Sequence, residues 1–491
     1  MSSPLAIYNG ATRAVDREFD STELPILFGE VPDDLRGVLY RNGPGKLVNH
    51  GVPYDHLFDG DGMVMRFEFS DNGVRYTNRF VRTEEYVREK EAGKVLYRSF
   101  GTNKPGGMPA NALRLHFKNA ANTSVRYHGG KLLALWEGGL PHELSPRTLE
   151  TVGRHDFDGV LAARDPVGKM MGNGMAFSAH PKRHPQTGEL HNFGLSTGRT
   201  QRLLFHRIDE EGKAQPPSAY EMPALSFVHD FVLTSEEDRI FLLVPVAFKL
   251  FRTFLGLTTP NGSITESRDR PTLIPVFSPD SMGETVQPIH VFEEEPCYVF
   301  HYPNGFRSDG RYIVDAMRMT AFPTSEDVKR VMESNSPTRP LYAYPTRFVL
   351  DPGSGAVRRT QLSDHPMELP SINPNYRGLP YRFIWGIANR PNVAASGTLH
   401  GIGKLDAESG EMTYHDFSPH FTGEPLFVPR SGSNSEDDGY LLSMIFDVEE
   451  ERTKLAVLKA DSLETVAVLA LPHATRLGFH GTFVRDADLR D

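Results

Sequence analysis

The chain is a succession of short strand-like segments separated by turn residues. Segments such as GVLYRN, MVMRFEF and RIFLLVPVAF are rich in β-branched and aromatic residues and are bounded by turn formers. With 44 Gly and 37 Pro among 491 residues, turns are frequent enough to interrupt any long element. Helical periodicity is nearly absent, and one short helix is expected to begin at the capping sequence Thr324-Ser325-Glu326-Asp327. The sequence therefore predicts an all-β protein.

A degenerate unit recurs along these segments, in which a strand ends at a turn former, Ser or Gly follows, and a second strand begins. The units lie at Asp71, Pro146, Asp209, Asp280, Asp351, Asp406 and Asp461. Their spacing of about 65 residues suits a four-stranded sheet with its connections, and radial repetition of such sheets is a β-propeller. Asp and Gly turns are common in any β protein, so the repeat alone favours a propeller without deciding it. No linker or shift in composition divides the chain, and residues 1–491 are expected to form a single domain.

Charge and cysteine content exclude several classes of protein. The 53 Lys and Arg against 63 Asp and Glu give a net charge of −10, whereas a nucleic-acid binder needs a basic surface. The single Cys297 excludes an internal disulfide and a Cys-rich metal site, and it agrees with a reducing compartment. The N-terminal sequence lacks the regions of a signal peptide, and no apolar stretch is long enough for a transmembrane helix. We therefore expect a soluble, cytoplasmic protein with no nucleic-acid partner and no obligate protein partner.

The 19 His residues are the unusual feature of the composition. Most lie in polar loops, but four lie beside aromatic or small apolar residues in or next to predicted strands, each in a different repeat unit: His180, His229, His301 and His480. In a propeller each could send one imidazole to the central axis. Four neutral nitrogen ligands would suit Fe, Zn, Cu or Ni better than Ca or Mg. Taken singly, each residue is more often an ordinary core or surface histidine.

Three Glu in apolar surroundings would complete such a metal site. A ligating imidazole usually donates its second N–H to a carboxylate or carbonyl, and a buried carboxylate needs a partner. Glu137 in ALWEGG, Glu368 in PMELPSINP and Glu424 in TGEPLFVPR fit this role. A nucleophile is less well supported, because no G-x-S-x-G elbow is present and Cys297 carries no catalytic signature. From the residues alone, a metal site and a set of ordinary histidines both stay open.

From about Gly37 to Val484 the sequence resembles the carotenoid cleavage oxygenases, a non-haem iron family. The resemblance is carried by ordered motifs that include GVLYRNGPG, HLFDGDGMV, NTSVRYHGGKLLALWEGGLPH, SAHP, VHDF, FHYPNGF, GEPLFVPR and FHGTF. It implies a seven-bladed propeller with Fe(II) on its axis, covered by a dome of loops and helices. It also implies a dioxygenase that cleaves one C=C bond of a carotenoid or apocarotenoid with O2 and yields two carbonyl products, retinal being one candidate.

The resemblance assigns roles to individual residues. The four histidines match the iron ligands, and the three Glu match carboxylates that orient three of them. Five residues match the substrate tunnel or its surroundings: Phe58, Thr123, Trp136, Phe227 and Phe300. Stilbene-cleaving relatives carry Lys where this chain has Trp136, which favours a polyene substrate. Asn122-Thr123-Ser124 also spells a glycosylation sequon, a poorer interpretation without a secretory signal.

An amphipathic segment follows a predicted core strand. Its apolar residues are interleaved with Lys249 and Arg252, and they are Phe248, Leu250, Phe251, Phe254, Leu255 and Leu257. The segment resembles the family's apolar patch that dips into a membrane to collect an insoluble substrate, so we expect peripheral membrane contact. A core or tunnel-lining helix is the alternative. Three other functions stay open: a stilbene- or phenylpropanoid-cleaving dioxygenase, a retinoid isomerohydrolase and a propeller that serves only as a scaffold.

Overall fold

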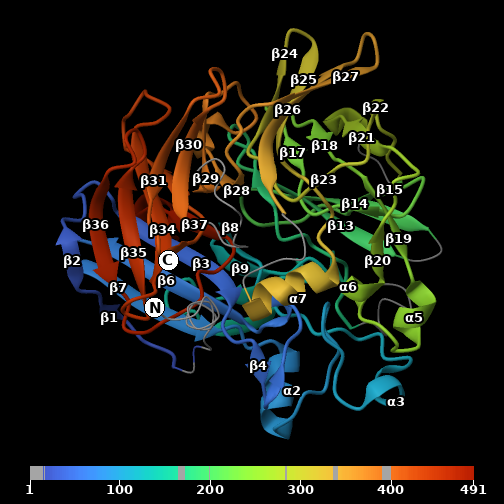
Figure 1. The fold of residues 1–491 in the computed structure, drawn as a ribbon, viewed down its shortest axis with the longest axis horizontal. Coiled ribbons are helices and arrows are strands. Elements are labelled where there is room, and N and C mark those ends of the chain that lie inside the picture. Colours follow the sequence, from blue (N-terminus) through green and yellow to red (C-terminus); the bar gives the residue numbers. More distant parts are fainter. Residues whose placement is uncertain are drawn as a thin grey trace.

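Strands dominate the computed structural model, which describes residues 15, 17–163, 172–197, 200–281, 285–334, 341–389 and 400–490. In Figure 1 the first strands of the described chain, in blue, lie side by side with the last strands, in red. Seven sheets of four or more strands make up most of the described chain, and two smaller sheets complete it.

The first three large sheets follow one another along the chain. The first has the order β1 (Thr22–Glu23), β7 (Gly73–Phe80), β6 (Gly62–Ser70), β3 (Gly37–Pro44) and β37 (Gly481–Val484). The second has the order β11 (Thr151–Arg154), β10 (His142–Leu144), β9 (Lys131–Leu135) and β8 (Ser124–His128). The third has the order β12 (Lys182–Arg183), β13 (Leu190–Thr197), β14 (Gln201–Ile208) and β15 (Ser218–Glu221).

The other four large sheets have the same antiparallel plan. The fourth contains β17 (Val232–Leu233), β18 (Arg239–Ile240), β21 (Thr272–Phe277) and β22 (His290–Glu294). The fifth contains β23 (Tyr298–Val299), β25 (Arg311–Met319), β26 (Ala343–Asp351) and β27 (Ala356–Gln361), with β24 (Gly305–Ser308) beside β25. The sixth contains β28 (Met367–Ser371), β29 (Phe383–Ala388), β30 (Gly401–Asp406) and β31 (Met412–Asp416). The seventh contains β2 (Ile26–Gly29), β36 (Thr465–Ala470), β35 (Arg452–Lys459), β34 (Gly439–Asp447), β32 (Phe421–Thr422) and β33 (Leu426–Pro429).

The predicted repeat marks the same place in every large sheet. Asp71 lies between β6 and β7, Pro146 between β10 and β11, and Asp209 between β14 and β15. The other four units lie in the same hairpin of their sheets, at Asp280, Asp351, Asp406 and Asp461. Each repeat is therefore the turn of a late hairpin, and the seven units correspond to seven blades.

Apolar residues between neighbouring sheets close the blades into a ring. Alternate residues of β3 face opposite sides, because side chains along a strand alternate in direction. Val38 and Tyr40 pack against the second sheet with Val125 and Leu132, whereas Leu39 packs against the seventh sheet. A separate buried cluster joins each remaining pair of adjacent sheets.

Strand exchange at the two ends of the chain also holds the ring together. The C-terminal strand β37 pairs with β3 of the first sheet, and the N-terminal strand β2 pairs with β36 of the last. The predicted propeller is confirmed, and its first and last blades share strands from both termini.

Short helices and two small sheets lie outside the seven blades. The helices are α2 (Glu84–Ala92), α3 (Gly107–Asn111), α5 (Leu250–Phe254), α6 (Pro260–Ser263) and α7 (Ser325–Ser334), with 3-10 turns η1 (Leu57–Asp59), η2 (Pro279–Ser281), η3 (Pro374–Tyr376) and η4 (Asp486–Asp488). The small sheets are β4 (Val48–Asn49) with β5 (Val52–Pro53), and β16 (Ser226–Phe227) with β19 (Val244–Phe248) and β20 (Ile264–Glu266).

Two of these outer elements bear on the predictions. The predicted helix start is confirmed at α7, where the Thr324 hydroxyl accepts from the Asp327 N–H and the Asp327 carboxylate accepts from the Thr324 N–H. Within the described ranges, none of the helices has the length and apolar character needed to cross a bilayer.

Candidate metal centre

The four predicted histidines lie next to edge strands of four different blades. His180 precedes β12, His229 precedes β17, His301 follows β23 and His480 directly precedes β37. Each of these strands is at the edge of its sheet. A propeller brings such edges together on its axis, and this explains how residues up to 300 positions apart in the sequence meet.

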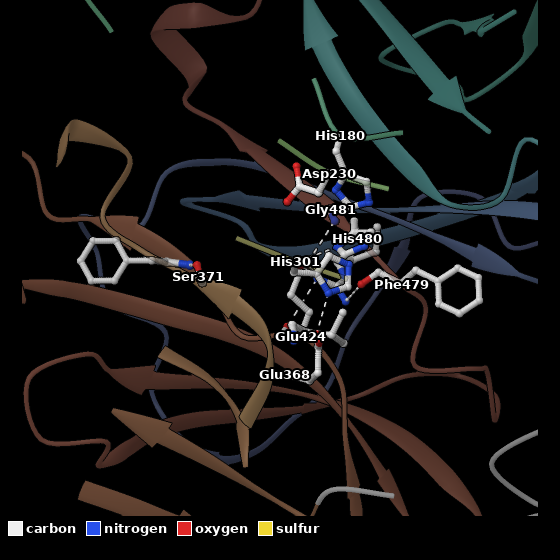
Figure 2. A network of polar contacts seen from close by, with 12 residues as sticks. His180, Asp230, His301, Glu368, Ser371, Glu424, Phe479, His480 and Gly481 are labelled. Carbon is white, nitrogen blue, oxygen red and sulfur yellow. Dashed lines mark hydrogen bonds and ion pairs between the residues drawn. The ribbon is translucent and has the colours of Figure 1, made fainter. Parts of the chain in front are cut away.

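The four imidazoles form one compact, buried group. Figure 2 labels three of them, His180, His301 and His480, which lie side by side. Their exposures are between 4% and 8%, and one nitrogen from each lies within 4.8 Å of the others. The closest approach, 2.9 Å, joins Nε2 of His180 to Nε2 of His229. The ring centroids of His301 lie 5.2 Å from those of His180 and His229 and 4.9 Å from that of His480.

Carboxylates fix the orientation of two of the rings. The Nδ1 of His301 lies 2.6 Å from Glu368 Oε2, and the Nδ1 of His480 lies 2.8 Å from Glu424 Oε1. A carboxylate accepts a hydrogen bond from the Nδ1–H group, so the neutral ring has its lone pair on Nε2. The Nε2 of His301 is buried and has no hydrogen-bond partner within the described structure. The contacts at Nδ1 therefore leave Nε2 of both rings as the nitrogen available to a metal ion.

Glu137, the third predicted carboxylate, has weaker contacts. Its Oε1 lies 3.4 Å from Nδ1 of His229 and 4.0 Å from Nε2 of His180, longer than a usual hydrogen bond. Burial raises the pKa of Glu137 to about 8, and the backbone N–H of Ala179 lowers it only in part. About a third of the side-chain surface stays accessible, 34%, so Glu137 borders an internal space beside the histidines.

Glu424 is held by a residue that the sequence analysis missed. Arg41 Nη1 lies 2.5 Å from Glu424 Oε2, and the Gly481 N–H donates to the same oxygen at 3.1 Å. Burial opposes ionisation of Glu424, but Arg41 and His480 lower its pKa to about 2. Arg41 is 1% exposed and lies in the GVLYRNGPG motif, where a charged residue inside an apolar strand is the available signal.

The donor set fits a transition-metal ion. Two nitrogens bound at right angles to one ion, each about 2.1 Å from it, lie about 3 Å apart, which agrees with the 2.9 Å between His180 and His229. Burial first, and then the neighbouring rings, lower the pKa values of His180 and His229, and burial also lowers that of His480. Burial acts in the same direction on His301, but the charge and hydrogen bond of Glu368 outweigh it and raise the pKa of that ring. Neutral imidazoles in a dry site are ligands for a divalent ion of the Fe–Zn series.

A second His and Glu group, formed by Glu189, His191 and Glu237, has the residue types of a metal site but not its chemistry. Arg239 donates to Nδ1 of His191 at 2.6 Å, so the neutral ring carries its proton on Nε2, the nitrogen that faces the two carboxylates. Arg207 already lies 2.6 Å from Glu189 and 3.3 Å from Glu237. A guanidinium occupies the place that a cation would take.

Comparison with known proteins decides the family. Residues 12–485 match the family model described as retinal pigment epithelial membrane protein. The chain belongs to this family. It is 35% identical to the apocarotenoid-15,15'-oxygenase of Synechocystis sp. over 93% of its own length and 92% of that protein, and 31% identical to the isoeugenol monooxygenase of Pseudomonas putida over 92% of each. The solved structure of cobalt-substituted Synechocystis apocarotenoid oxygenase superposes with a TM-score of 0.88, 32% identity and coverage of 98% and 99%.

Two of the aromatic residues that the resemblance assigned to a tunnel, Phe227 and Phe300, lie beside His229 of this family member. Phe300 meets the His229 ring edge-on at 4.9 Å, and Phe227 stacks parallel to it at 6.4 Å. Phe58 packs edge-on at 5.4 Å against Phe479, the neighbour of His480. Trp136 directly precedes Glu137 and bridges to Phe177. The sequence analysis missed Phe479, whose place beside a ligand was the available signal.

Thr123 and its sequon are part of the same structure. The Thr123 carbonyl accepts from the His480 N–H at 3.3 Å, and the Thr123 N–H donates to Leu135 at 3.0 Å. Asn122 is fully buried and donates to the carbonyls of Phe58 and Gly60. The Asn122 amide therefore holds the η1 loop in place. Because this amide is buried, it is not accessible for glycosylation.

The predicted amphipathic segment is only partly exposed. Leu250, Phe251, Phe254 and Leu257 are 50%, 73%, 41% and 50% exposed. Phe248 packs instead against a buried cluster with Tyr298 and Phe322, and Leu255 is half-buried. Two exposed residues of the α3 region, Met108 and Leu113, extend the surface, since the Leu113 N–H donates to the Phe254 carbonyl at 2.9 Å. The sequence could not show that Met108 and Leu113 lie next to α5, because they are more than 130 positions away from it in the chain.

Proposed function

We propose that this protein is an Fe(II)-dependent dioxygenase that cleaves one C=C bond of a carotenoid or apocarotenoid with O2 to give two carbonyl products. The observation that carries the proposal is the convergence of four buried imidazoles, two of them oriented by carboxylates. Similarity to an apocarotenoid oxygenase over nearly the whole chain supports the substrate class.

His180, His229, His301 and His480 would hold the iron, and Glu137, Glu368 and Glu424 would orient three of these rings or balance their charge. Bound Fe(II) would supply the site at which O2 is activated. Four neutral ligands leave the charge of the ion uncompensated by its own ligands, which makes it a strong electrophile. Ionised Glu424, held by Arg41, keeps the Nδ1 proton of His480 in place and so preserves the metal-binding tautomer.

Phe227, Phe300 and Phe58 would hold the polyene beside the histidines. Their faces and edges pack well against a flat conjugated chain and exclude water from it. The bond that lies nearest the histidines is then selected by position, since a small displacement moves the next bond into its place. Trp136, which precedes Glu137, and Thr123, whose carbonyl accepts from the His480 N–H, would limit that displacement.

The test is to incubate iron-loaded protein separately with an apocarotenal, a C40 carotenoid, a stilbene and isoeugenol under 18O2. We expect labelled aldehydes from the apocarotenal, and loss of turnover in His229→Ala and His301→Ala. Consumption of only the phenolic substrates would replace the polyene by the phenylpropanoid alternative. Turnover that survives both substitutions would overturn the proposed metal centre.

We also propose that the exposed residues of the α5 region contact a membrane and collect the insoluble substrate there. Four apolar side chains of this region are 41% to 73% exposed, which is costly in water and favourable in an interface. Lys249 and Arg252 lie between them and suit a lipid headgroup layer. Met108 and Leu113 widen the same surface.

Vesicle flotation tests the membrane contact. Phe251→Asp should reduce the bound fraction several-fold and lower turnover of vesicle-embedded substrate, while turnover of detergent-dispersed substrate stays unchanged. Val152→Asp is the matched control, because Val152 is 69% exposed on β11 in another blade. Equal flotation of the parent and Phe251→Asp would contradict the proposal.

A further inference from the structure

Two carboxylates beside the histidines, Glu424 and Asp230, each form an ion pair with one cation. Glu424 is paired with Arg41 at 2.5 Å. Asp230, the neighbour of His229, lies 2.7 Å from Lys182 and also accepts from the backbone N–H groups of Phe231 and Tyr302. Figure 2 shows Asp230 and Gly481 next to the histidines. These contacts satisfy both negative charges.

Arg126 is a third cation at the same place and has no carboxylate within 4.0 Å among the described residues. It lies on β8, the strand at one edge of the second blade. Among the described residues, the Arg126 side chain makes one hydrogen bond, a long one of 3.4 Å from Nη1 to the carbonyl of Gly481. Its Nε has no hydrogen-bond partner among those residues. Burial lowers the pKa of Arg126, which Glu424 and Asp230 offset only in part.

Arg377 is a fourth cation, and its side chain has no hydrogen bond or ion pair to any described residue. It follows η3, in a loop of the sixth blade that is fastened to two other blades. Asn304 donates to the carbonyls of Tyr376 and Leu379 and accepts from the Gly378 N–H, while the Ser235 N–H donates to Gly378. Burial and the charge of Arg126 lower the pKa of Arg377 to about 10, so it stays charged at neutral pH.

Among the described residues, two guanidinium groups are therefore left without a carboxylate in contact after the other charges pair. Burying an unpaired charge is costly, and arginine cannot escape the cost by losing its proton near neutral pH. Arg126 and Arg377 are both partly buried, so neither guanidinium is freely exposed to water. Burial first, and then the charges of Arg377 and Arg126, lower the pKa of Lys182, so all three cations act on one another.

We infer that Arg126 and Arg377, with Lys182 beside them, form a binding site for one small planar oxyanion, a carboxylate or bicarbonate, on the propeller axis next to the four histidines. A guanidinium presents parallel N–H donors that match two oxygens of such an ion. The ion would supply the negative charge that the chain lacks here.

The test uses metal-loaded protein and sodium formate as the probe, with sodium chloride at equal ionic strength as the reference. We expect one formate per chain by calorimetry and a higher thermal midpoint in formate than in chloride. Arg126→Gln and Arg377→Gln should each weaken formate binding at least tenfold and abolish the formate-dependent shift. Arg358→Gln is the matched control, because Arg358 is exposed on β27, and it should behave as the parent does.

The results separate this site from binding at the metal itself. Formate that binds equally well to the parent, Arg126→Gln and Arg377→Gln contacts the metal or another surface and overturns the inference. A parent midpoint that is equal in formate and chloride overturns it without any variant. Bicarbonate titrated in the same way should compete with formate, whereas a divalent anion such as sulfate, which is not planar, should compete less well.

Discussion

Two groups of His and Glu lie within the described part of the chain, and they differ in where the protons are held. In the four-histidine group, carboxylates face Nδ1 of His301 and His480 and leave Nε2 basic. In the group around His191, Arg239 faces Nδ1 and forces the proton onto Nε2. The same residue types thus give a metal site in one place and a structural network in the other.

The difference teaches that the neighbour of the second ring nitrogen decides the chemistry of a histidine. Arginine has donors only, so any imidazole that it contacts must accept. The second group is also already neutralised, since Arg207 lies within 3.3 Å of both Glu189 and Glu237. A cluster of His and Glu side chains is therefore not enough to identify a metal site, and the cations around the cluster must also be considered.

The largest effect should come from removing a ring of the first group. His301→Ala takes away one of four nitrogen donors and leaves Glu368 without its imidazole, so iron affinity should fall by more than about 100-fold. Equilibrium dialysis against iron measures it. His191→Ala is the matched change in the second group, and iron bound per chain should stay at the parent value. Equal iron loss in both variants would break the comparison.

Removing a supporting carboxylate should have the next largest effect. Glu424→Gln keeps the shape of the side chain but loses the charge that holds His480 and Arg41, and iron affinity should fall by about 10- to 100-fold. Glu237→Gln is the control in the second group. If Glu424→Gln binds iron as the parent does, the carboxylate does not set the tautomer.

The pH dependence of stability separates the second group from the rest. Burial, Arg239 and Arg207 lower the pKa of His191 to about 2, far below its unfolded value of 6.5. Below pH 6.5 the His191 ring therefore binds a proton in the unfolded chain but not in the folded protein. The free energy of unfolding then decreases as the pH falls. His191→Gln should reduce that slope by up to about 1.4 kcal/mol per pH unit between pH 6 and 4. Urea unfolding at several pH values measures it, and an unchanged slope would contradict the assignment.

The smallest effect should come from the cation of the second group. Arg207 is 31% exposed, so Arg207→Met should lower the free energy of unfolding by only about 1 kcal/mol. Added Zn(II) should not restore this loss, because Arg239 still holds the His191 proton on Nε2. Recovery of the parent stability with zinc would show that Arg207, not the tautomer, excludes a metal.

Much of the fold could be predicted because turn chemistry is local. Each repeat unit marks one hairpin of one blade, and the capping sequence at Thr324 begins α7. The strand-end positions of the four histidines were also readable, since apolar neighbours on both sides indicate a buried strand. Arg41 and Phe479 were not selected, because their roles depend on residues hundreds of positions away.

Local sequence by itself determined the strands, the seven repeated turns and the buried surroundings of the four histidines, because strand propensity and turn residues act over a few positions. Tertiary structure alone decided which nitrogen of each ring is free, which carboxylate has a cation, and which guanidinium groups have none. Those properties depend on distances across the axis between blades. Coulomb and hydrogen-bond energies follow distance in space, and sequence separation does not report it.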